Sequence, residues 1–322
     1  MISAQPTLAK VITVWGPSSL SNLGPGFDAL GLCLAGWGDR IHATLLDRPG
    51  VEVALSNPNP SWDCPLEGRN NTAAVAAASV LEACGVSDRG LRLEIEKGVP
   101  PGSGLGSSSS SAVAGGWAAN LALGKPLSKA SIVNAVLDGE QIASGGRHGD
   151  NVLPALLGGL VLVSASDPCR YRQVSIPDGL HIALILPDVQ ILTKQARAML
   201  PQHVSLRDAV HNASELAFMI DAFRSGDWVT VGQCMMADRL VEPVRSTLLP
   251  CYDAVRSAAL EAGAYGCALS GSGPALFAIT SSPAQAEEIL AAMVHASEAM
   301  NIAVTGLATT VDRSGVRQIS PD

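Results

Sequence analysis

A run of glycine and serine at residues 100–111 (PPGSGLGSSSSS) constrains the fold of this chain more than any other segment. It joins a strand-like segment, 91–95, to a helix-like segment, 107–123. Glycine adopts backbone conformations that a Cβ forbids and lets a ligand reach main-chain N–H groups. The unpaired N–H groups and positive dipole at the start of a helix attract anions, phosphate above all. The run therefore predicts a phosphate-binding loop.

Glycine–serine runs are more often flexible linkers, which is the alternative interpretation. The periodic apolar segments on both sides of the run favour a loop, because a linker would lack them. The Walker motif does not fit, since no lysine follows the glycines, and the dinucleotide fingerprint fails because Ser107 stands at its third glycine position. A Gly-x-Ser-x-Gly nucleophile elbow is absent from this run and from the sequence around Ser272.

Length and composition set the class of protein. The chain has 322 residues, which is enough for two domains of ordinary size. Hydrophobic residues make up 47% of it but aromatic residues only 4%, so alanine, valine and leucine must fill the core. A net charge of −8 argues against nucleic acid or an acidic membrane surface as a partner. The longest apolar stretch, 152–163, is shorter than the roughly 20 residues that cross a bilayer.

The seven cysteines point to a reducing compartment. They show no CxxC pair and no metal-ligand spacing, and most have apolar neighbours. An odd number of such residues is typical of buried free thiols. Residues 1–10 lack the apolar centre of a secretory signal. Together these features predict a cytoplasmic protein.

Periodicity and turn residues predict a mixture of strands and helices. Strands are expected at 11–14, 29–34, 40–46, 91–95, 158–164, 180–186, 267–270, 275–280 and 303–311, with a turn-rich loop at 16–26. Helices are expected at 72–83, 107–123, 129–142, 193–199, 206–225, 227–237, 249–262 and 282–300. Because strands and helices do not alternate strictly, the pattern favours an α+β fold, divided into residues 1–165 and 166–322.

Four blocks along the chain carry a resemblance to a known family. They are residues 16–28 (GPSSLSNLGPGFD), the glycine–serine run, residues 145–159 (GGRHGDNVLPALLGG) and residues 263–274 (GAYGCALSGSGP). The second and fourth resemble the signature motifs of the GHMP kinases. The first and third resemble the homoserine kinase family in particular, as do residues 186–197 (LPDVQILTKQAR) and 242–245 (EPVR).

The resemblance implies a two-domain fold with the active site in the cleft between the domains. Residues 1–165 would form an ATP-binding domain like ribosomal S5 domain 2, and residues 166–322 a ferredoxin-like domain. The implied activity is phosphorylation of the terminal hydroxyl of L-homoserine in threonine biosynthesis, with ATP and Mg²⁺, by a homodimer. Two alternatives stay open: another GHMP kinase with a mevalonate-like or sugar acceptor, and a catalytically silent metabolite sensor on the same fold.

The resemblance also implies which residues bind the nucleotide. The ATP phosphates would lie against Pro101, Gly102, Ser103, Gly104, Leu105, Gly106, Ser107 and Ser108. Ser108 and Glu140 would hold Mg²⁺, which needs only one or two protein oxygens beside phosphates and water. Asn70 and Asn71 would contact the adenine. The alternative for Glu140 is an ordinary exposed glutamate on a helix.

The residues implied to bind homoserine are Asn22, Asp28, His148, Asn151, Thr193, Arg197, Arg245 and Gly271. Asp28 would pair with the ammonium, and the two arginines would clamp the carboxylate. The alternatives are arginines on a helix surface and a histidine that only holds its loop. Mevalonate-type relatives have an aspartate base where this chain has Asn151. We therefore expect catalysis by positioning and electrostatics, with Asn151, Glu140 and Ser108 as the catalytic residues, and the role of Asp150 stays open.

Overall fold

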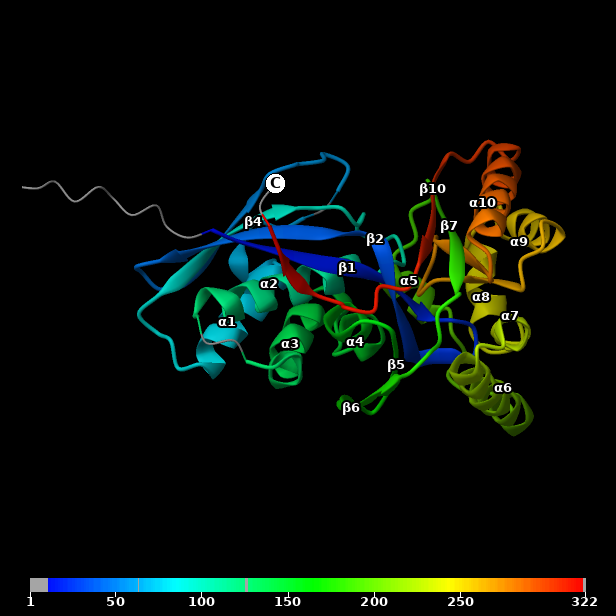
Figure 1. Cartoon of the computed structure of the whole chain (residues 1–322), viewed down its shortest axis with the longest axis horizontal. Coiled ribbons are helices and arrows are strands. Elements are labelled where there is room, and N and C mark those ends of the chain that lie inside the picture. Colours follow the sequence, from blue (N-terminus) through cyan, green and yellow to red (C-terminus); the bar gives the residue numbers. More distant parts are fainter. Residues whose placement is uncertain (1–10, 63, 125–126, 321–322) are drawn as a thin grey trace, which may run out of the picture.

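The computed structural model of this chain describes residues 11–62, 64–124 and 127–320. The expectation that residues 1–10 carry no secretory signal falls outside this part. Two bodies lie side by side in Figure 1, a large sheet with helices on one face and a smaller sheet with its own helices. This arrangement confirms the α+β class. Among the described residues, no helix combines the length and the apolar character needed to cross a membrane.

Seven described strands form the larger sheet. They run in the order β11-β1-β2-β4-β3, and β5 pairs with β2 while β6 pairs with β5. Their bounds are β1 Ile12–Asn22, β2 Gly26–Leu46, β3 Gly50–Leu55, β4 Gly90–Glu96, β5 Leu160–Ser164, β6 Asp167–Val174 and β11 Arg317–Ile319. The helices of this part are α1 Thr72–Ala83, α2 Ser107–Ala122, α3 Val133–Ser144 and α4 Gly149–Leu157, with 3₁₀ turns at Gly68–Asn70 and Lys129–Ile132. Figure 1 shows these helices gathered below the sheet.

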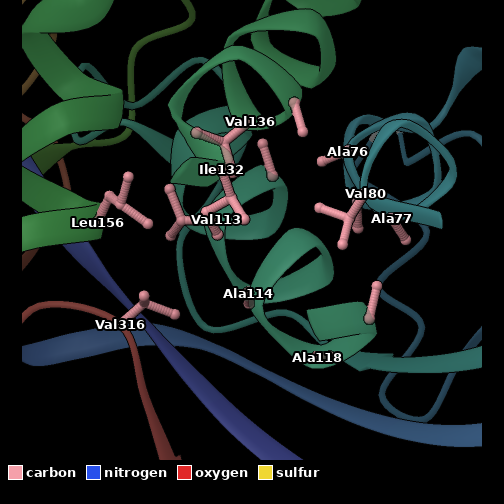
Figure 2. Packing of buried hydrophobic residues seen from close by; sticks show 14 of the residues in the cluster. Ala76, Ala77, Val80, Val113, Ala114, Ala118, Ile132, Val136, Leu156 and Val316 are labelled. Carbon is pink, nitrogen blue, oxygen red and sulfur yellow. The ribbon is translucent and has the colours of Figure 1, made fainter. Parts of the chain in front are cut away.

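Small side chains pack the first core, as the composition indicates. Figure 2 shows alanines and valines of α1 facing those of α2, and side chains of the Lys129–Ile132 turn, α3 and α4 complete the cluster with Val316, which directly precedes β11. Gly115 lets α1 and α2 approach closely, because a Cβ there would lie 2.4 Å from the carbonyl oxygen of Ala73. The close approach fixes the direction of α2, whose first turn lies at the functional site.

The smaller sheet has the ferredoxin-like order that the family resemblance implies. Its strands are β7 His181–Pro187, β8 Gly266–Leu269, β9 Leu276–Thr280 and β10 Val304–Thr310, in the order β10-β7-β9-β8, and every pair is antiparallel. Its helices are α5 Thr193–Ala198, α6 Leu206–Ser225, α7 Trp228–Met235, α8 Glu242–Arg245, α9 Tyr252–Glu261 and α10 Pro283–Glu298, with a 3₁₀ turn at Ser246–Leu248.

The prediction of a turn-rich loop at residues 16–26 is correct only at residues 23–25, where a short turn joins β1 to β2, and is wrong for residues 16–22. Residues 16–22 continue β1, and β2 is one strand of 21 residues where two were expected. The register between β1 and β2 shifts at Pro17/Ser19, so the ladder absorbs the turn-forming residues by an irregularity rather than ending there. Helices α4 and α8 and strands β3, β6 and β11 were not predicted. Tertiary pairing overrides local propensity in each strand.

The chain passes from the larger sheet to the smaller one between β6 and β7, and returns to the larger sheet at β11. The larger sheet thus contains residues on both sides of position 165. The division into residues 1–165 and 166–322 stays a prediction.

Candidate active site

Elements of both bodies line one cavity of about 460 Å³. Every residue that the sequence analysis assigned to a site lines it except Leu105. The Leu105 side chain is fully buried in the core, and its N–H donates to Ser103 Oγ at 3.3 Å. Leu105 therefore holds the loop in shape, and its contact with phosphate stays a prediction.

The glycine loop leaves the first turn of α2 open toward the cavity. Gly106 precedes α2 with φ +68°, and no side chain of the described residues caps this helix. Gly104 lies against the second body, because a Cβ on it would meet the carbonyl oxygen of Ser270 at 2.4 Å. Free N–H groups at the start of a 16-residue helix suit an anion such as phosphate.

A buried ion pair supports this turn from below. The Lys97 ammonium contacts Asp39 at 2.5 Å, and both side chains are almost fully buried. Lys97 also donates to Ser107 Oγ and to Ser111 Oγ, each at 2.9 Å. The Asp39 carboxylate accepts further hydrogen bonds from the backbone N–H groups of Gly98 and Val99. A cation thus lies fixed beneath the first turn of α2, at the α2 end of the cavity.

Glu140 lies at this end of the cavity and is only 6% exposed. Ser109 Oγ donates to its Oε2 at 2.7 Å. Burial raises the pKa of Glu140 to about 7, while hydrogen bonds from Ser109 and Ser108 lower it. This is not the exposed glutamate of the alternative interpretation. A carboxylate and a serine hydroxyl at the α2 end of the cavity are the kind of oxygen donors that suit Mg²⁺.

Asn151 is held in place by two serines of β1. Ser19 Oγ donates to Asn151 Oδ1 at 2.9 Å, and Asn151 Nδ2 donates to Ser21 Oγ at 3.0 Å. The amide is therefore fixed at both ends. The neighbouring Asp150 is buried, and burial together with the charge of Asp28 raises its pKa to about 6.

The opposite end of the cavity holds the charges expected for an amino acid. Arg197 donates to both oxygens of Asp28, at 3.0 and 2.9 Å. Arg245 donates to the carbonyl oxygen of Gly271 at 2.8 Å, and its Nε finds no hydrogen-bond partner among the described residues. Both guanidinium groups lie over the ring of Phe27, at 5.3 and 5.0 Å from its centroid. Arg245 is buried, so it is not the helix-surface arginine of the alternative interpretation.

Neutral groups line the space between these charges. Asn22 Nδ2 donates to the carbonyl oxygen of Gly271 at 3.0 Å, and Thr193 Oγ1 lies 3.4 Å from Ser272 Oγ. His148 is half-buried beside Arg197, and burial and that charge lower its pKa, which favours the neutral imidazole. It can therefore donate or accept a hydrogen bond.

The two asparagines assigned to adenine lie at the α1 side of the cavity. Asn71 Oδ1 caps α1 by accepting from the N–H groups of Ala73 and Ala74, and Asn70 Nδ2 donates to Glu67 at 2.7 Å. Both amides thus have structural roles, and their contact with adenine stays a prediction.

The sequence analysis missed Lys97, Ser21 and Ser272, which also line the cavity. Lys97 lies two residues after the predicted strand 91–95 and precedes the glycine loop, and this position was the available signal. Ser21 and Ser272 lie inside the motif blocks but carry no spacing that sets them apart from their neighbours.

Comparison with known proteins decides the family. The model of the GHMP kinase N-terminal domain matches residues 71–159, and that of the GHMP kinase C-terminal domain matches residues 219–298. The chain is 39% identical over 266 residues to a homoserine kinase of Pyrococcus abyssi, across 83% of this chain and 86% of that protein. The chain belongs to the homoserine kinase family of the GHMP kinases.

Other members of the homoserine kinase family cover more of the chain. The homoserine kinase of Arabidopsis thaliana is 38% identical over 301 residues, which is 92% of this chain and 80% of that protein. The crystal structure of homoserine kinase from Cytophaga hutchinsonii superposes with a TM-score of 0.91 at 35% identity, across 98% of this chain and 99% of that one. The family, the two-domain fold and the class of phosphotransferase expected from the motifs are thereby confirmed.

Proposed function

We propose that this member of the homoserine kinase family transfers the γ-phosphoryl group of ATP to the terminal hydroxyl of L-homoserine. The observation that carries the proposal is one cavity with an open helix N-terminus at one end and an Asp28, Arg197 and Arg245 cluster at the other. The first suits a triphosphate, and the second suits a zwitterion.

The amino-acid end favours homoserine over a sugar or mevalonate. A sugar would call for neutral hydrogen-bond donors and acceptors, and mevalonate carries no ammonium for Asp28. A zwitterion replaces the Asp28–Arg197 ion pair by two new pairs, its ammonium with Asp28 and its carboxylate with Arg197. The largely buried guanidinium of Arg245, which also lines the cavity, supplies a further positive charge for the carboxylate.

At the phosphate end, Ser108 and Glu140 would hold Mg²⁺, which when bound neutralises charge on the phosphate oxygens. Asn151 is fixed by Ser19 and Ser21, and an amide accepts no proton at neutral pH. We therefore assign it to positioning the acceptor hydroxyl. The hydroxyl proton leaves late, to the γ-phosphate itself. A pH–rate profile with one essential carboxylate that disappears in Asp150→Asn would contradict this mechanism.

The test is ADP release by purified protein with Mg-ATP and one acceptor at a time: L-homoserine, D-homoserine, mevalonate, galactose or none. Turnover with L-homoserine alone is the expected result. Turnover with another acceptor alone would support the assignment of the phosphate end to ATP and contradict the assignment of the other end to an amino acid. A protein that binds L-homoserine without turnover would be the silent sensor, against which the buried Glu140 beside the loop argues.

The proposal extends to the oligomeric state of the protein and to its cellular compartment. A homodimer and a cytoplasmic location are what the family resemblance and the cysteine pattern imply. Four of the cysteines, Cys33, Cys234, Cys251 and Cys267, are buried as free thiols, which agrees with a reducing compartment.

A further inference from the structure

Helix α6 presents an exposed apolar stripe that the kinase reaction does not use. Its inner face, with Met219 and Phe223, packs into the core of the second body. On the outer face, Leu206, Val210 and Phe218 are 81%, 59% and 66% exposed. Figure 1 shows α6 at the outer edge of this body. Large exposed apolar side chains gathered on one helix face make this face a candidate interaction surface.

The residues of this face have a symmetric order about Ser214. Val210 and Phe218 lie four positions before and after it, and Arg207 and Asp221 lie seven positions before and after it. At about 100° per residue these five side chains fall on one stripe of the helix. All five are exposed, and the described residues offer neither Arg207 nor Asp221 an ion pair. Along the helix, the stripe therefore has a positive side chain, an apolar one, a small one, a second apolar one and a negative one.

Such an order is self-complementary in an antiparallel pair. If two copies of α6 cross at Ser214, the rise of about 1.5 Å per residue places Val210 of each beside Phe218 of the other. Arg207 of each then lies opposite Asp221 of the other. An isologous contact repeats every interaction twice. The small Ser214 at the crossing allows close approach of the two backbones.

We propose that this α6 stripe is the interface through which two copies of the chain associate around a twofold axis. The stripe has a positive charge at one end and a negative charge at the other, so an identical stripe that runs in the opposite direction matches both charges. This match identifies a second copy of the chain as the occupant. The proposal does not depend on which acceptor the kinase uses, since the stripe contains no residue of the cavity.

Charge-swap variants of the full chain test it by sedimentation or light scattering. The wild type is expected at about twice the 33.0 kDa of one chain. Arg207→Asp and Asp221→Arg each place like charges opposite one another, and each is expected to weaken dimerisation at least tenfold. The double variant restores both pairs, so it is expected to recover the dimer. Glu287→Arg, an exposed charge change on α10, is the matched control and is expected to remain a dimer.

A monomeric wild type would overturn the proposal, and so would single variants that dimerise as the wild type does. A double variant that stays monomeric would also overturn it, because the proposal pairs these two charges across the copies. Recovery of the dimer would show that the single variants did not fail through a folding defect, since a second substitution would not repair one. Phe218→Ser tests the apolar part of the interface, because it removes apolar contact and leaves the charges. It is also expected to weaken dimerisation. ADP release by each variant, at the wild-type rate per chain, would show that the fold is intact.

Discussion

At the scale of single residues, the cavity relies on groups whose burial changes their chemistry. Glu140 is buried beside the first turn of α2 and has a pKa raised to about 7, so in the free protein it is only partly charged at neutral pH. A bound divalent cation would favour the charged form. Affinity for Mg²⁺ is therefore expected to rise as pH increases through 7.

Removing the Glu140 charge tests its assignment to the metal. Glu140→Gln keeps the size of the side chain and an oxygen for the Ser109 hydroxyl, but loses the anion. We expect a fall in turnover on the order of 100-fold or more, partly recovered at high Mg²⁺. Asp138→Asn, on the same helix and paired with the exposed Arg147, is the control. ADP release across a Mg²⁺ titration measures both, and equal losses in the two variants would contradict the assignment.

Glu242 makes stability depend on pH. Tyr252 Oη donates to its Oε1 at 2.6 Å and the Leu269 N–H at 3.1 Å, which ties α8, and with it Arg245, to β8. Burial raises the pKa of Glu242 to about 7 from an unfolded value of 4.5. The unfolded chain releases this proton first as pH rises, so the free energy of unfolding falls between these two values and levels off above 7.

Glu242→Gln is expected to remove this dependence. The wild type should lose on the order of 3 kcal/mol of stability between pH 4.5 and 8 through this group, and the variant should not. Urea unfolding of both proteins at several pH values gives the difference directly. A constant difference across the range would show that Glu242 does not carry the effect. Glu261→Gln, an exposed carboxyl on α9, serves as the comparison.

At the scale of elements, the glycine loop depends on contact with the second body. Gly104 has φ +78°, and a Cβ on it would lie 2.4 Å from the backbone oxygen of Ser270. Gly104→Ala is therefore expected to cost about 1–3 kcal/mol of stability and to reduce turnover more than tenfold.

Gly124→Ala is the control that separates the backbone strain at a positive φ from the clash with Ser270. Gly124 has φ +65° with open space around its Cβ position, so this variant shares the backbone penalty but not the clash. Thermal unfolding and ADP release should show a small stability loss and unchanged turnover. Equal effects on turnover at both positions would contradict a special role for Gly104.

Helices whose sequence has a continuous helical pattern could be predicted from the sequence. Strands that depend on hydrogen bonding to a neighbouring strand could not. Helix α1 has the predicted bounds, and α6 does as well, because each has caps and a continuous helical pattern. Strand β1 carries Pro17, Ser18 and Ser19, which read as a turn, and only the register with β2 makes them strand. The short β11 exists because β1 offers it an edge.

The same distinction applies to the site. The glycine run predicted an anion site from local chemistry alone, and in the structure the run directly precedes the uncapped first turn of α2. Arg197 and Arg245 needed the family resemblance, since nothing in their helices distinguishes them from surface arginines. Lys97 was missed because its role depends on Asp39, 58 positions away in the chain.

At the scale of the whole molecule, one loop joins the two bodies at the cavity. The Gly271 N–H donates to the Ser21 carbonyl at 3.1 Å, and the Ala275 N–H donates to the Ser103 carbonyl at 3.1 Å. Ser270 Oγ donates to the Gly104 carbonyl at 2.6 Å. Because the nucleotide end lies mainly on the first body and both arginines on the second, a bound substrate pair spans both.

Ligands that span two bodies are expected to stabilise both together. Each ligand at 100 times its Kd adds about 2.7 kcal/mol to the free energy of unfolding, which raises Tm by several degrees. Mg-ATP and L-homoserine should therefore each raise Tm of the wild type. In Arg245→Gln the rise with L-homoserine should largely vanish, because the buried guanidinium that faces its carboxylate is gone, while the rise with Mg-ATP should persist. Arg92→Gln, an exposed change on β4, should keep both rises. An unchanged L-homoserine rise in Arg245→Gln would contradict the amino-acid end of the cavity and leave the phosphate end intact.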